Sequence, residues 1–225
     1  WLWWVALATI AMGAVGVLAS KDLRKLVANL VIVSVGTLVA LVAVQTIEAS
    51  SAAIYYLVHS TLVTAALFLL ADLIGRQRGK TSDRITAGPP VSQPRLLGVC
   101  FLIAGISVIG MPPLSGFIGK VWLLKATLNL EYTMVFWPLY LLASLAILLG
   151  VSKAGSTVFW NHQTKVSEAV EQKRVHPSQL VALFILISGA PLMTIFAGPL
   201  SEYAIDAATQ LHDFNNIKVI FLGGK

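Results

Sequence analysis

The chain has 225 residues, of which 57% are hydrophobic and only 12% are charged, and its formal net charge is +6. Soluble domains carry about 25% charged residues, so this composition predicts an integral membrane protein and excludes a soluble enzyme. The basic residues lie in short clusters between apolar runs, without interleaved aromatic residues, which argues against nucleic acid as a partner.

The apolar runs predict an all-α fold, a polytopic transmembrane helix bundle with about six spans, one of them discontinuous. A spanning helix needs roughly 20 apolar residues. The expected spans are about 2–19, 26–47, 52–74, 96–130, 133–151 and 177–197. We assign residues 1–199 to the bundle and residues 200–225 to a C-terminal tail. A polar loop with proline breakers covers 76–95.

The run 96–130 is about half again too long for one span. Prolines remove backbone donors, and glycines weaken helix continuity. The residues expected to break this helix are Pro112, Pro113, Gly116 and Gly119. Lys120 lies just beyond the break, at membrane depth. Because a break and a charge are both costly in hydrocarbon, their proximity indicates a buried, hydrated site.

The basic residues are distributed unequally between the two sides of the membrane. The first, third and fifth connections hold three, five and four of the 16 Lys and Arg residues, and the second and fourth hold none. Cytoplasmic loops carry the excess of Lys and Arg. We therefore expect both ends of the chain to face away from the cytoplasm. The two basic residues within a span are Lys120 and Lys125.

The sequence offers no ligand set for a metal or redox cofactor. Its single cysteine, Cys100, lies in an apolar run, and the four histidines are scattered. We expect no metal and no cofactor. The chain begins with Trp1 rather than methionine, and we expect it to be part of a longer protein.

Three segments resemble a known family in their order and spacing: Asp22–Lys25, Tyr55–Asp72 and Gly110–Lys120. This is the family of antiporter-like subunits, which includes the large Mrp cation/proton antiporter subunits and the proton-pumping membrane subunits of respiratory complex I. The resemblance extends to about Ala197. The sequence segments 67–74 and 153–156 are most similar to the D subunit of the Mrp antiporters.

The resemblance implies a fold of about fourteen helices with two inverted five-helix repeats, each containing a broken helix. This chain is similar to helices nine to fourteen, which include the second repeat. In such a protein, ionisable residues lie in a row along the midplane of the membrane. The family's other essential groups, a glutamate and a lysine of the first repeat, would lie outside this sequence.

The resemblance also implies roles for individual residues. Lys120 falls on the family's lysine in the second broken helix, and His59 falls on the histidine of the preceding helix. Val63 is a departure, since the longest complex I homologue has a lysine there. A proton path would then rely on His59, water and nearby hydroxyls. These hydroxyls are Ser60, Thr61 and Thr64.

Each ionisable residue also has a structural interpretation. An isolated cation at the depth of Lys120 costs roughly 2.5–3.5 kcal/mol, and it could instead be held by carbonyls freed at the break. His59 suits a relay because histidine changes charge near physiological pH, or it could be a neutral, hydrogen-bonded interface residue. Lys125 follows Lys120 by about 140° of helix rotation and could join the relay or reach the outer surface.

Two groups of charges flank the expected cytoplasmic side. Asp22 and Lys25 could gate proton uptake, or could serve topology and interfacial ion pairing. Asp72 and Arg76, four residues apart on one helix, predict a surface ion pair.

These features predict a proton-translocating subunit of a multi-subunit Na⁺/H⁺ antiporter in the bacterial cytoplasmic membrane. Such a protein is a secondary transporter subunit rather than an enzyme. Its expected partners are other subunits of the complex, protons, Na⁺ and membrane lipids. Two alternatives remain open at this point: a proton-pumping subunit of complex I, which is driven by quinone reduction, and a scaffold subunit that does not conduct.

Overall fold

The computed structural model describes residues 1–128, 133–160 and 176–213. Within these ranges the regular structure is helical, with one isolated antiparallel bridge between Asp22 and Arg84. The helices are α1 (Leu2–Ala19), α2 (Leu23–Val44), α3 (Ile47–Gln77), the 3₁₀ helix η1 (Gly79–Thr81), α4 (Pro94–Ile109), α5 (Ser115–Ala126), α6 (Thr133–Phe159), α7 (Pro177–Ile195) and α8 (Ala197–His212). The predicted all-α class is confirmed.

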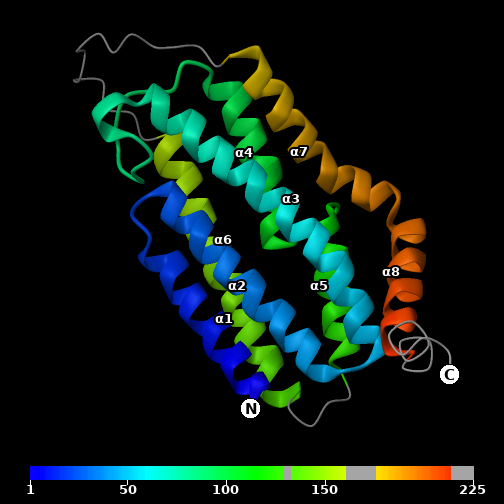
Figure 1. Ribbon diagram of the computed structural model, residues 1–225. Helices are drawn as coiled ribbons and strands as arrows, with labels where there is room; N and C mark the ends of the chain where they lie inside the picture. Colours follow the sequence, from blue (N-terminus) through cyan, green and yellow to red (C-terminus); the bar gives the residue numbers. More distant parts are fainter. Residues whose placement is uncertain (129–132, 161–175, 214–225) are drawn as a thin grey trace, which may run out of the picture.

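The predicted spans are present as helices. Among the described residues, α1, α2, α3, α6 and α7 are long and apolar enough to cross a membrane. The 16 residues of α4 rise only about 24 Å, which is less than the bilayer's hydrocarbon core of about 30 Å. In Figure 1, α4 and α5 lie in opposite halves of the bundle. Together they replace one continuous span, as the sequence predicts.

Helix α3 is the centre of the bundle. It has 31 residues and contacts α2, α4, α5, α7 and α8 (Figure 1). Small and polar residues along it are buried together with its leucines, so its burial is not confined to one face. This position places His59 between the broken helix and the rest of the bundle.

Two helices begin earlier than the sequence predicts. Helix α2 starts at Leu23 because Asp83, which is distant in sequence, accepts hydrogen bonds from Leu23 N and Arg24 N at 2.8 and 3.0 Å. Helix α3 starts at Ile47, where Thr46 Oγ1 accepts from Ala49 N at 3.2 Å. Such caps satisfy backbone donors that a helix start leaves unpaired.

The loop after α3 is organised around a buried arginine. Arg78 is 1% exposed, and its guanidinium donates to the carbonyls of Arg84 and Thr86 at 2.7 and 2.6 Å. A planar group with several fixed donors can bind several carbonyls of one loop. The same loop supplies Asp83, so Arg78 fixes the segment that caps α2.

The end of the described chain is helical. Helix α8 begins at Ala197 and covers the first part of the segment predicted as a tail. Ala204 and Ala208 are buried, and Ser50 Oγ is hydrogen-bonded to His212 Nε2 at 2.9 Å. Helix α8 is therefore attached to the beginning of α3, at the same end of the bundle as the N-terminus (Figure 1).

Helices α1 and α2 approach each other through glycines. A Cβ atom at Gly13 would lie 2.7 Å from Val33 Cγ2, and one at Gly36 would lie 2.9 Å from Ile10 N. Small residues at such contacts let the backbones approach closely, which increases the van der Waals packing that helps helices associate in a bilayer.

Replacing Gly36 by isoleucine should weaken this helix pair by about 1–3 kcal/mol, because the added atoms meet the backbone of α1. The measurement is equilibrium unfolding of the full-length protein in mixed micelles. Ala28→Ile is the control, since Ala28 is exposed on the same helix. Equal stability of the two variants would contradict the close packing.

Candidate functional site

The break between α4 and α5 leaves backbone carbonyls without their helical partners. In a continuous helix the Ile109 carbonyl would accept from residue 113, which is a proline and has no N–H. Gly110 ends α4 with a left-handed φ of 79°, and its N–H donates to the carbonyls of Ile106 and Ser107. The chain then passes through Pro112 and Pro113 before α5 begins.

Gly116 and Gly119 lie inside α5 rather than in the break. A Cβ atom at Gly116 would overlap the Ser107 carbonyl oxygen and would lie 3.1 Å from His59 Cε1. One at Gly119 would lie 3.5 Å from the Tyr56 ring. Gly116 thus allows α5 to approach both α4 and α3.

Lys120 turns back from α5 onto the broken end of α4. Its Nζ donates to the Ile109 carbonyl at 2.7 Å and to Ser144 Oγ of α6 at 2.8 Å. The same nitrogen lies 5.5 Å from the centroid of the Tyr140 ring, within cation–π range. The lysine therefore supplies the donor that Pro113 lacks, and its ammonium is surrounded by a carbonyl, a hydroxyl and a ring.

His59 forms a second polar cluster on the other side of α5. The side chain is 3% exposed, and its Nδ1 is hydrogen-bonded to Ser115 Oγ at 2.8 Å. The Tyr56 ring lies 6.1 Å from the imidazole, and its hydroxyl is hydrogen-bonded to Ser34 Oγ of α2 at 3.2 Å. The two clusters are joined through α5, which carries both Ser115 and Lys120.

The other residues predicted for a proton path take different positions. Val63 is buried in the apolar core. The hydroxyls of Ser60, Thr61 and Thr64 donate to carbonyls of their own helix, at 3.2, 2.7 and 2.6 Å. Lys125 is exposed near the end of α5. Of these residues, only Lys125 is charged, and it lines a cavity at the end of α5.

Asp22 and Lys25 lie at the opposite end of the bundle and pair at 2.7 Å. The predicted ion pair between Asp72 and Arg76 is confirmed, at 2.6 Å, and Asp72 also binds Arg24 at 2.8 Å. These contacts tie the α1–α2 turn to the end of α3.

Sequence reasoning missed Ser115 and Ser144. Ser115 was detectable, because it opens the helix directly after the proline break. Ser144 was not, since a lone serine in an apolar span gives no signal until the fold brings it to Lys120.

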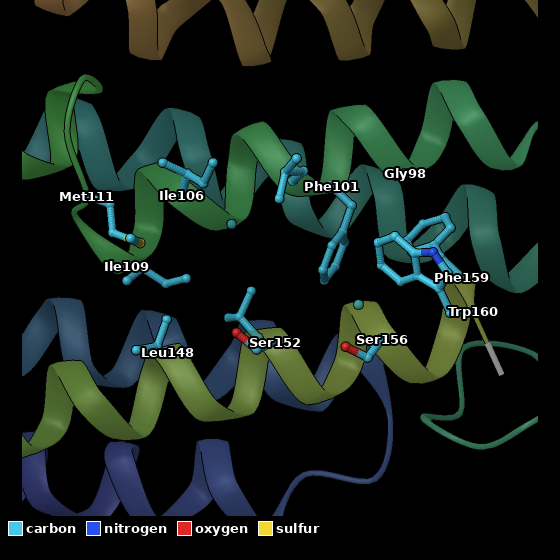
Figure 2. Close-up of a pocket in the computed structure, with 14 residues that line it drawn as sticks. Gly98, Phe101, Ile106, Ile109, Met111, Leu148, Ser152, Ser156, Phe159 and Trp160 are labelled. Atoms are coloured by element: carbon cyan, nitrogen blue, oxygen red, sulfur yellow. The ribbon is translucent and has the colours of Figure 1, made fainter.

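No group of three His, Cys, Asp or Glu residues in the described part of the chain could hold a metal ion. A groove of about 380 Å³ lies between α4 and α6. Figure 2 shows Phe101 and Ile106 of α4 facing Leu148 and Ser152 of α6, with Trp160 at one end. Its lining is mainly apolar, which fits a surface in contact with lipid tails rather than a polar site.

Comparison with known protein families identifies the family of this chain. Residues 1–150 match the family described as "NADH:quinone oxidoreductase/Mrp antiporter, TM", and this is more than half of the chain. The chain belongs to this family. The resemblance of the three motif segments is therefore confirmed, and the chain is part of a multi-pass membrane protein.

Individual relatives support the same assignment. The chain is 32% identical over 206 residues to a Bacillus subtilis protein named as the D subunit of a Na(+)/H(+) antiporter, covering 90% of this chain and 41% of the relative. The chain thus spans less than half the length of that relative.

Two solved structures share the fold. A chain of the Mrp complex from Dietzia sp. superposes with a TM-score of 0.75 at 22% identity, covering 94% of this chain and 47% of that one. A chain of respiratory complex I from Thermus thermophilus superposes with a TM-score of 0.72 at 24% identity, covering 91% and 44%.

Gly116→Ala should destabilise the full-length protein by about 1–3 kcal/mol, because its methyl group meets a backbone carbonyl that cannot move aside freely. The melting temperature in detergent measures the effect. Gly98→Ala is the matched control, since its Cβ atom would lie 3.6 Å or more from its neighbours. If both variants melt together, Gly116 does not set the approach of α4 and α5.

Proposed function

We propose that this chain is part of a proton-translocating, D-type subunit of a multi-subunit Na⁺/H⁺ antiporter. The observation that carries the proposal is the placement of Lys120. A single ammonium group contacts the carbonyl end of α4 and the Ser144 hydroxyl inside an apolar bundle. A charge at this depth is costly, and charged residues inside a membrane bundle commonly mark ion or proton pathways.

In the proposed relay, Lys120 and His59 exchange protons through water and hydroxyl groups. Ser115 is bonded to His59 and lies on the same helix as Lys120, so α5 provides the route between them. Lys125 would continue the route toward the far end of α5. Asp22 and Lys25, at the opposite end, would form the gate on the cytoplasmic side.

The proposed location is the bacterial cytoplasmic membrane, with the basic loops in the cytoplasm. The α1–α2 turn, the loop after α3 and the helix ends beside them carry eight of the eleven described basic residues. The N-terminus and the end of α8 lie at the opposite end of the bundle (Figure 1). Lys and Arg favour the cytoplasmic side, so this arrangement supports both described ends facing outward. The residues 161–175, which carry three further basic residues, lie outside the described part.

The antiporter is preferred to a complex I subunit because the relative at 32% identity is named as part of a Na(+)/H(+) antiporter, whereas the likeness to complex I at 24% identity concerns the fold. Co-purification separates the two. An assembly of membrane subunits supports the antiporter, and iron–sulphur and flavin partners contradict it. A scaffold subunit remains the alternative if the contact of Lys120 with Ile109 serves structure only.

Lys120→Ala in the full-length subunit, within its assembled complex, should abolish Na⁺-dependent proton exchange, because the relay loses its central protonatable group. The measurement is the collapse of a pH gradient in everted vesicles on addition of Na⁺. Lys153→Ala is the control, since this lysine is exposed on α6.

A native gel establishes that each variant complex assembles. Unchanged exchange in an assembled complex that lacks both Lys120 and His59 contradicts the relay and supports the scaffold alternative.

A further inference from the structure

A second cavity lies between the beginning of α3, the end of α5 and one side of α8. It has a volume of about 330 Å³, and its lining includes Glu48 and Ser51 of α3, Trp122 and Lys125 of α5, and Ile205 of α8. This is the end of the bundle away from the basic loops (Figure 1). The hydrogen bond between Ser50 and His212 holds α8 in place beside it.

The packing of α3 against α5 connects this cavity with His59. Along this interface His59 contacts Ser115 first. One turn closer to the cavity, Tyr55 lies against Gly119 and Trp122. Trp122 also lines the cavity. On α3, the polar positions 48, 51, 55 and 59 are spaced by three, four and four residues, which places them on one face. A stripe of polar groups therefore runs from the cavity to the imidazole.

The Tyr55–Trp122 pair separates the cavity from His59. Its ring centroids lie 5.8 Å apart, and the Tyr55 hydroxyl donates to the Met193 carbonyl of α7 at 3.3 Å. Helix α7 thus fixes the position of the Tyr55 side chain. The ring pair lies between the cavity and the imidazole.

Glu48 and Lys125 bring opposite charges to the cavity without forming an ion pair, although both side chains are described. A liquid water molecule occupies about 30 Å³, so the cavity has room for several. A carboxylate at a water-filled opening exchanges protons readily with solvent.

We propose that this cavity is the outer mouth of the proton path and that Glu48 is the group that exchanges protons with the outer solution. The inference rests on the proposed function. In the direction that the everted-vesicle assay follows, the Glu48 carboxylate takes a proton from the outer solution. When the Tyr55–Trp122 pair opens, water carries that proton from the carboxylic acid to the neutral His59 imidazole, which leaves a carboxylate and an imidazolium.

The first experiment tests solvent access and does not depend on transport. Ala126→Cys is introduced into the full-length subunit after replacement of Cys100 and any other cysteine. A small, membrane-impermeant methanethiosulfonate cation is added to intact cells. Because Ala126 lines the cavity, we expect labelling from outside. Ala65→Cys, on α3 but away from the cavity, should stay unlabelled. Absence of labelling, or labelling only in everted vesicles, overturns the outer mouth.

The second experiment tests Glu48 itself in the assembled complex. Glu48→Gln should slow exchange by about tenfold, less than the roughly 10²- to 10⁴-fold typical of proton-transfer groups, because water partly replaces the carboxylate. Glu48→Asp should restore most of the rate. Glu202→Gln, an exposed carboxylate on α8, is the matched control. A Glu48→Gln rate equal to this control overturns the role of Glu48.

The two proposals fail in different ways. If Lys120→Ala leaves exchange intact, the relay fails, yet labelling at position 126 still decides whether the cavity opens to the outer solution. If Lys120 is essential while Ala126→Cys is not labelled from outside, the relay stands and the outer mouth is wrong.

Discussion

The structure depends on one backbone constraint, the absence of an N–H at Pro113. The Ile109 carbonyl needs a donor, because a backbone group left unsatisfied at membrane depth costs several kcal/mol. Lys120 reaches back from α5 and donates to it at 2.7 Å. The same contact gives the ammonium group a partner at a depth where it would otherwise be expensive. Break and charge therefore stabilise each other.

The register between α3 and α5 follows from this arrangement. Once α5 is positioned by Lys120 at one point and by Gly116 at another, its first residue meets His59 and its last turn meets the beginning of α3. A shift of one residue would turn Ser115 by about 100° away from the imidazole. Backbone packing at Gly116 and the contact of Lys120 with Ile109 together align the polar groups of the bundle.

Much of the fold was predictable because membrane spans are set by length and hydropathy. The positions of α1 and α6, and the break before Lys120, followed from runs of apolar residues and from two prolines. The start of α2 was not predictable, since Asp83 caps it from a loop about 60 residues away. In the site, Lys120 and His59 were visible as polar residues in apolar spans. Their partners were hidden, because Ser144 becomes significant only when α6 packs against α5.

The glycine contacts between α1 and α2 limit how the bundle can move. With Gly13 against Val33 and Gly36 against Ile10, neither helix can slide along the other without first separating from it. Asp83 and the Asp22–Arg84 bridge fasten the turn between them to the neighbouring loop. Helices α1 and α2 are consequently expected to move together as one rigid unit. In the proposed transport cycle, displacements fall to α5, which follows the non-helical residues 110–114.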